Sequence, residues 1–173
     1  MKTTMKVWMF FTLVLLIAPA MQAQKVNVDW DHNVQNFSAF KTYSWVKPVR
    51  TTSNPLMDQR IVTAIEGQLA AKGLQKVDSA ADVLVTYHPG VQQERTATAM
   101  GMGGWRRSGG MTTVNQNTSK IGTLVVDMSD AKTKQLIWRA SASDTLSDKP
   151  DKNSQKIEKA VTKMFKKYPP PAK

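Results

Sequence analysis

The chain of 173 residues contains no cysteine. A fold without disulfides has to be held by side-chain packing, and a chain of this length buries enough surface for that. The absence of thiols also excludes a cysteine nucleophile, a sulfur-ligated metal and the acylated cysteine that anchors bacterial lipoproteins. We therefore expect a domain that is stabilised by its hydrophobic core alone.

The N-terminus has the three parts of a secretory signal peptide. Lys2 and Lys6 precede an apolar run over residues 7–17, and small residues follow as far as Ala23. The run has 11 residues, which is too short for a retained anchor, because a membrane-spanning helix needs about 20. Cleavage is predicted after Ala23, with Ala20 as the alternative site.

We accordingly interpret residues 1–23 as a signal peptide and residues 24–173 as a single α+β domain. The predicted location lies outside the cytoplasm. It is the periplasm, the outer membrane without a lipid anchor, or the medium.

Positive charge is concentrated at the C-terminal end of the sequence. The chain has a net charge of +11, and its last 25 residues carry eight lysines against Asp151 and Glu158. Such a concentration of charge attracts anionic polymers and lipids. Because export excludes nucleic acid, we expect an anionic envelope polymer, a membrane surface or an envelope protein as the partner, while the oligomeric state stays open.

Residue patterns predict both helices and strands. Alternating apolar positions are typical of strands, and apolar residues three and four apart are typical of amphipathic helices. They predict strands over residues 25–30, 42–46, 81–88, 112–128 and 135–144, and helices over residues 55–72 and 153–168. We expect an α+β fold of order β-β-α-β-β-β-α, in which an antiparallel sheet of about five strands carries both helices on one face.

The ends of the first helix carry local signals. Asn54 is a typical capping residue, and Pro55 suits the first helical turn, where its missing N–H costs nothing. Gly73 followed by Leu74 predicts a left-handed stop with an apolar contact.

A second local signal interrupts the strand pattern. Pro89 and Gly90 follow the run over residues 81–88 and predict a bend or bulge at a sheet edge. Pairing is expected to resume over residues 91–98.

Residues that commonly perform catalysis are few. There are two histidines, and the nucleophile-elbow, P-loop and zinc-protease motifs are missing. Asp29, Asp31 and His32 form the densest polar cluster; its carboxylates offer part of a calcium site or, as we prefer, cap a turn at a strand end. His88 is interpreted as a solvent-edge residue. We predict no catalytic, cofactor-binding or metal-binding residue.

Two groups of residues are candidates for contact with an anionic surface. One is Trp105, Arg106 and Arg107, in a glycine-rich segment that lacks the helix start a phosphate-binding loop needs. The other lies along the apolar stripe of the second helix and comprises Lys156, Lys159, Lys163, Lys166 and Lys167. The alternatives are a hairpin tip anchored by the tryptophan, and lysines that simply stay in water.

An ordered set of motifs runs through the chain: residues 37–45 (FSAFKTYSW), 81–88 (ADVLVTYH), 122–127 (GTLVVD), 130–139 (DAKTKQLIWR) and 165–170 (FKKYPP). Together they resemble the bacterial family called domain of unknown function four-one-three-six. The resemblance implies an envelope protein and assigns no reaction and no functional residue. Many members are lipoproteins, whereas this chain lacks the cysteine that is acylated in them.

These observations favour an exported, non-enzymatic envelope protein that binds an envelope partner or an anionic surface. The alternative is a small periplasmic assembly or scaffolding protein, because the hairpin around residues 127–138 is also similar to one in curli-secretion and penicillin-binding-protein-activator lipoproteins. A hydrolase that uses Asp29, Asp31 and His32 is the least favoured hypothesis.

Overall fold

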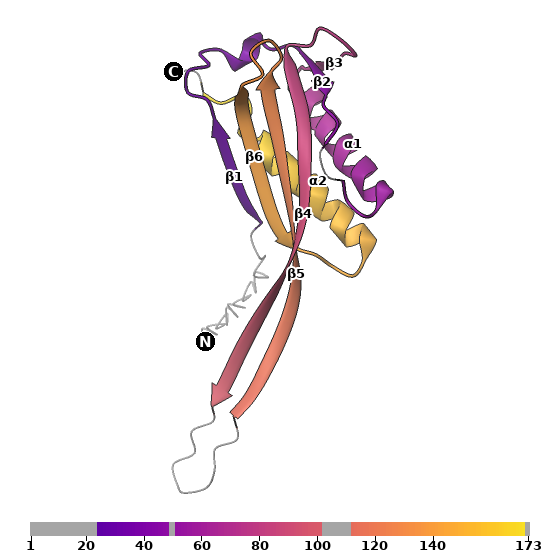
Figure 1. Cartoon of the computed structure of the whole chain (residues 1–173), viewed down its shortest axis with the longest axis vertical. Coiled ribbons are helices and arrows are strands. Elements are labelled where there is room, and N and C mark those ends of the chain that lie inside the picture. The colour runs from indigo at the N-terminus through magenta and orange to yellow at the C-terminus, as the bar shows by residue number, and fades with distance from the viewer. Residues whose placement is uncertain (1–23, 49–50, 102–111, 172–173) are drawn as a thin grey trace, which may run out of the picture.

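A computed structural model describes residues 24–48, 51–101 and 112–171, which form one sheet covered by two helices (Figure 1). The strands are β1 (Lys25–Trp30), β2 (Thr42–Trp45), β3 (Gln75–Lys76), β4 (Val83–Gly101), β5 (Thr112–Asp130) and β6 (Leu136–Thr145). The helices are α1 (Pro55–Ala71) and α2 (Pro150–Phe165), and a 3-10 turn covers Phe37–Ala39. The predicted signal peptide lies outside the described residues.

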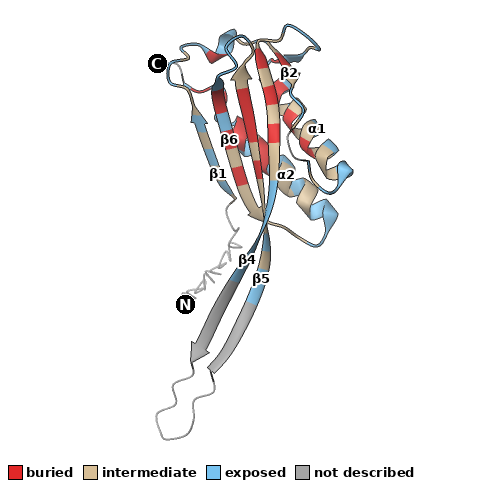
Figure 2. Ribbon diagram, in the orientation of Figure 1, coloured by how far each residue is buried: buried red, intermediate tan, exposed pale blue. Residues whose placement is uncertain are grey.

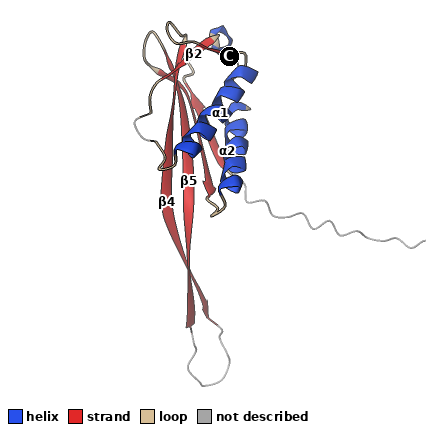
Figure 3. Cartoon of the chain, turned by 90° about the vertical axis from the view of Figure 1, so that its right-hand side faces the viewer, coloured by secondary structure: helices blue, strands red, loops and turns tan. Residues whose placement is uncertain are grey.

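The sheet has six strands in the order β1-β6-β5-β4-β2-β3. The predicted number of about five was wrong because of β3, which has only two residues and therefore shows no alternation in the sequence. With β3 added, the order of elements along the chain is the predicted one. Both helices cover the same face, as expected (Figure 3).

The expectation of an antiparallel sheet was also wrong in part. β5 pairs antiparallel with both β4 and β6, and β1 pairs antiparallel with β6. β2, however, pairs parallel with β3 and β4. The reason is the connection: α1 crosses over between β2 and the strands that follow, and a crossover helix returns the chain in the same direction. The sheet is therefore mixed.

Residues 81–98 do not form two strand segments separated by a bulge. β4 pairs with β5 in one continuous register, in which Pro89 lies opposite Leu124 and Gly90 opposite Thr123. The register shift of this sheet lies elsewhere, between Met128 and Ser129. Pro89 is tolerated because β2 last pairs with β4 at Val85, which leaves the proline on an edge that needs no second hydrogen bond.

The predicted ends of α1 are confirmed. The Asn54 side chain accepts a hydrogen bond from the Leu56 N–H at 3.0 Å, and Pro55 occupies the first turn. Gly73 has a φ of 83°, and the N–H of the buried Leu74 bonds to the carbonyl of Leu69 at 3.0 Å. α2 begins three residues earlier than predicted, because Pro150 supplies its first turn.

The core lies between the helices and the face of the sheet that they cover, with buried residues on β2, β4, β5 and β6 (Figure 2). Trp138 at its centre is fully buried and packs against Phe165, with ring centroids 5.1 Å apart, and against Tyr168 at 5.6 Å. Beyond this body β4 and β5 continue as a two-stranded extension. We call residues 91–101 and 112–121 the arm (Figure 1).

Candidate functional site

Four of the predicted surface lysines lie together on one flank of α2 and the turn after it. Lys159, Lys163, Lys166 and Lys167 are all exposed, whereas the apolar residues beside them in sequence, such as Val161 and Phe165, are buried. None of the four takes part in an ion pair within the described residues. We call these four residues the lysine flank.

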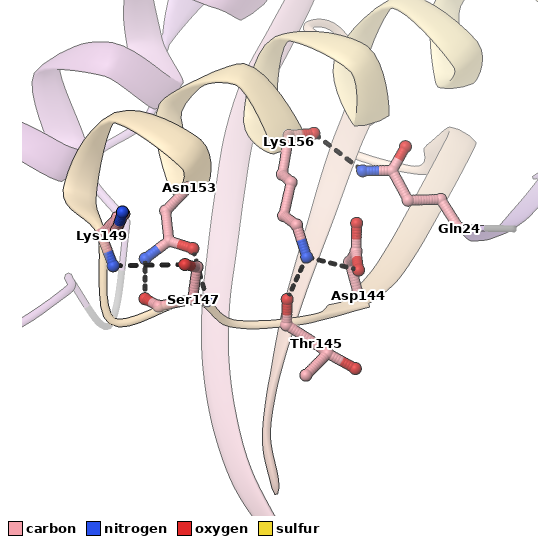
Figure 4. Close-up of polar contacts among 7 residues, drawn as sticks. All are labelled: Gln24, Asp144, Thr145, Ser147, Lys149, Asn153 and Lys156. Carbon is pink, nitrogen blue, oxygen red and sulfur yellow. Dashed lines mark hydrogen bonds and ion pairs between the residues drawn. The ribbon is translucent and has the colours of Figure 1, made fainter. Parts of the chain in front are cut away.

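Lys156 lies on the same side of α2 but is engaged within the fold (Figure 4). Its Nζ lies 3.1 Å from Asp144 Oδ1 and donates to the Thr145 carbonyl at 2.5 Å. Its own carbonyl accepts from Gln24 Nε2 at 2.8 Å. Lys156 therefore ties α2 to the end of β6 and to the start of the described chain, in contrast to the lysine flank.

A partly open cavity of about 230 Å³ lies beside Lys156, between the N-terminal halves of both helices and the sheet. Its walls are mostly apolar and come from five elements and the segments between them. The main apolar contributors are Met57, Ile61, Val91, Leu124, Ala142, Leu146, Ile157 and Ala160. At Gly122 a Cβ would lie 2.6 Å from Leu146 Cδ2, so glycine at this position lets Leu146 close one wall.

Asn153, at the rim of the cavity, bonds to the segment that precedes α2 (Figure 4), whereas the buried Gln24 Oε1 of the lining has no hydrogen-bond partner in the described residues. Asn153 Oδ1 accepts from the Ser147 N–H at 2.8 Å, and Asn153 Nδ2 donates to the Ser147 carbonyl at 2.7 Å. The Lys149 N–H donates to Ser147 Oγ at 3.2 Å. The lining residues include no histidine and no nucleophile beside a base. The mostly apolar walls of the cavity can hold an apolar group.

A second polar cluster lies on the open face of the sheet, which carries no helix. Asp127 on β5 is 5% exposed, and both of its oxygens accept from Arg139 on β6, with Nε and Nη2 at 2.6 Å. His88 Nε2 lies 3.3 Å from Asp127 Oδ2. The hydrogen bonds that Arg139 donates to Asp127 raise the pKa of Arg139, and they outweigh its partial burial, which lowers this pKa. The cluster holds three strands together through side chains.

Sequence reasoning missed this cluster. Asp127 and Arg139 are direct cross-strand partners. The turn that follows β5 is shaped by Asp130, which accepts from the N–H groups of Lys132 and Thr133. Counting residue pairs outward from the turn over 130–135 would have placed Asp127 opposite Trp138, because the register shift between Met128 and Ser129 moves the pairing by one residue.

The Asp29, Asp31 and His32 cluster is arranged as a strand end. Asp31 Oδ1 accepts from the Asn33 N–H at 2.8 Å and from Asn33 Nδ2 at 2.9 Å, as in the preferred turn interpretation. Asp29 Oδ1 accepts from the Trp30 N–H at 2.9 Å, and the His32 ring packs against Trp30. Among the described residues there is no group of three acidic, histidine or cysteine side chains placed to hold a metal ion.

The other predicted contact group, Trp105, Arg106 and Arg107, lies outside the described residues. Within the described part of the chain, neither helix is both long enough and apolar enough to cross a bilayer.

A family model described as Domain of unknown function (DUF4136) matches residues 26–170. No curated protein matches the sequence.

A PDZ domain protein from Parabacteroides distasonis is similar in structure over 86% of this chain, with 17% identity and a TM-score of 0.59. The match covers 36% of that protein, so this chain spans about a third of its length. A variant PelC dodecamer from Paraburkholderia phytofirmans matches 83% of this chain and 95% of its own, with 11% identity and a TM-score of 0.50. At these identities the likeness shows a shared fold.

Proposed function

Because the chain belongs to the family described as Domain of unknown function (DUF4136), to which no activity is attached, we propose a function from its surface: it is an exported, non-enzymatic envelope protein that binds an anionic surface through the lysine flank. The predicted signal peptide supports export. The engaged polar groups around the cavity support a role without catalysis.

The observation that carries the proposal is the contrast between Lys156 and its neighbours. Lys156 forms an ion pair with Asp144 and donates to the Thr145 carbonyl. The four lysines of the flank point away from the core and have no carboxylate within ion-pair distance in the described residues. The four charges of the flank are therefore exposed at the surface.

The size of the effect follows from the number of charges. Each lysine near an anionic surface contributes about 1 kcal/mol, so the flank contributes about 4 kcal/mol, or roughly a thousandfold in affinity. The interaction is screened beyond about 10 Å at about 0.1 M salt, so it must weaken as salt is added.

The test is co-sedimentation of residues 24–173 with vesicles of anionic and of zwitterionic lipid over about 0.05 to about 0.5 M salt. The flank variant changes all four lysines to glutamine. A matched control changes Lys41, Lys47, Lys72 and Lys132 to glutamine. These lysines are also exposed, so the control removes the same amount of charge from other parts of the surface. We expect the flank variant to lose at least a hundredfold in affinity and the control less than tenfold. Equal losses would show that only net charge matters and would refute a dedicated surface.

The second candidate function is an assembly or scaffolding role in the envelope. It is favoured by the arm, whose strands beyond Glu94 and Ser119 pair only with each other in the described residues. A protein partner that stays bound at high salt would favour this role over binding to an anionic surface.

A further inference from the structure

Most of the arm has no neighbour in the described residues beyond its own two strands. β2 pairs with β4 only as far as Val85, β6 pairs with β5 only as far as Ile121, and the Leu146 N–H bonds to the Lys120 carbonyl. From Glu94 and Ser119 to Gly101 and Thr112, β4 and β5 pair with each other alone in the described part of the chain (Figure 1). Both outer edges of the arm therefore present unpaired main-chain N–H and C=O groups.

Neither face of the arm is covered where its side chains are described. Residues 90–95 are all exposed, and Val91 is 64% exposed. Successive side chains of a strand point to opposite faces, so six consecutive exposed residues mean that both faces are open. On the other strand, Asn117, Thr118 and Lys120 are exposed as well.

A ribbon of this kind is marginally stable in water. Two strands need a third strand, or a surface on one face, before they are stable independently. The arm nevertheless contains five threonines together with Val91, Val114 and Ile121, which favour strands, and it contains no proline. The arm is thus suited to pairing with something outside the body.

The composition of the arm identifies the partner. The arm carries Glu94, Arg95 and Lys120, a net charge of +1, while the whole chain carries +11. An acidic partner would be drawn to the lysine flank instead, and an apolar partner would find no apolar stripe, because Gln, Thr and Asn fill both strands. A second arm, by contrast, supplies an edge of equal length without charge repulsion.

We propose that the arm joins two copies of this chain by edge-to-edge strand pairing. Edge-to-edge pairing brings one strand of each arm into contact, and that strand has 11 residues in β4 and 10 residues in β5. Two identical edges related by a two-fold axis run antiparallel, so one position near the middle of the arm meets its own copy. The association does not depend on the lysine flank.

Single-cysteine cross-linking tests the contact, and the absence of native cysteines makes each introduced thiol unique. One cysteine at a time is placed at residues 92–99 of the chain from residue 24 onward, and at Lys132 as a control on the body surface. After mild oxidation we expect disulfide-linked dimers with a maximum at one arm position, and almost none from Lys132→Cys. Equal yields everywhere, or none in the arm, would overturn the proposal.

An arm-shortened variant tests whether the arm is required. Residues 94–119 are replaced by Asn-Gly, a two-residue hairpin turn, which removes no core residue. We expect light scattering to give a dimer for the unmodified chain and a monomer for the variant, with the same thermal unfolding midpoint once the dimer is dissociated by dilution. A monomeric unmodified chain, or a variant that remains dimeric, contradicts the proposal. Vesicle binding by the flank variant is measured separately, so either proposal can fail alone.

Discussion

Removing Arg139 should destabilise the fold more than neutralising Asp127, although the two residues form one ion pair. Asp127 is 5% exposed and cannot move into water, whereas the Arg139 side chain is 52% exposed. Arg139→Met leaves a buried carboxylate with only His88 as a partner, at 3.3 Å. Asp127→Asn instead leaves a guanidinium that is already half solvated.

The expected magnitudes follow from burial. An uncompensated charge in a deep interior costs about 3 to 5 kcal/mol, and the half-exposed arginine side lets water in, so we expect Arg139→Met to lower the free energy of unfolding by about 2 kcal/mol. Asp127→Asn should cost about 1 kcal/mol, because a partly exposed ion pair contributes little. The double variant should resemble Asp127→Asn, which gives a coupling energy of about 2 kcal/mol.

Urea unfolding of residues 24–173 at neutral pH measures all three variants. His88→Gln is the control. The His88 ring lies 3.3 Å from Asp127, and we expect this substitution to change the free energy of unfolding by less than about 0.5 kcal/mol. Additive effects, or a larger loss from Asp127→Asn than from Arg139→Met, would refute the reasoning from burial.

Two further predictions concern Tyr168 and Asp82. The Tyr168 hydroxyl is buried without a hydrogen-bond partner in the described residues, and burial raises its pKa to about 12. Tyr168→Phe removes this unpaired group, so it should raise the free energy of unfolding measured in urea by up to about 1 kcal/mol. A lower free energy of unfolding would show that the hydroxyl has a hydrogen-bond partner. The N–H of Lys41, together with the hydroxyl and N–H of Thr42, lowers the pKa of Asp82, so its contribution to stability is present above the unfolded value of about 3.9 and is lost as pH falls through the folded value. Asp82→Asn should flatten the loss of stability below about pH 4 in acid titrations followed by circular dichroism, and an unchanged slope would count against this role.

Local chemistry made most of the elements predictable. The cap at Asn54 and the stop at Gly73 depend on a few adjacent residues, so α1 was placed within one residue at its C-terminal end. The alternation that ends at Trp30 likewise gave the bounds of β1. The sequence also identified the lysine flank, because helical spacing alone separates a lysine face from an apolar stripe.

Long-range pairing was not predictable in the same way. Alternation in β2 says which residues share a face but nothing about the direction of its neighbour, which depends on the α1 crossover. The cavity is formed by five elements that are distant in sequence, so no local sequence pattern predicts it. The ion pair between Lys156 and Asp144 could not be predicted either. The helical spacing groups Lys156 with the lysine flank, but its contacts depend on the end of β6, which lies outside the helix pattern.

The two proposed surfaces differ in the forces they use, and this determines how they would work together. The lysine flank acts through charge and weakens with salt, whereas the arm carries a net charge of +1 and acts through main-chain hydrogen bonds that salt affects little. A dimer joined through its arms carries two flanks, and a second flank that reaches the same surface benefits from a high effective concentration. A flank that binds weakly in one copy therefore holds a dimer much more firmly. This explains why a basic helix and a neutral arm belong in the same chain, since the arm multiplies an attraction that four lysines alone leave sensitive to salt.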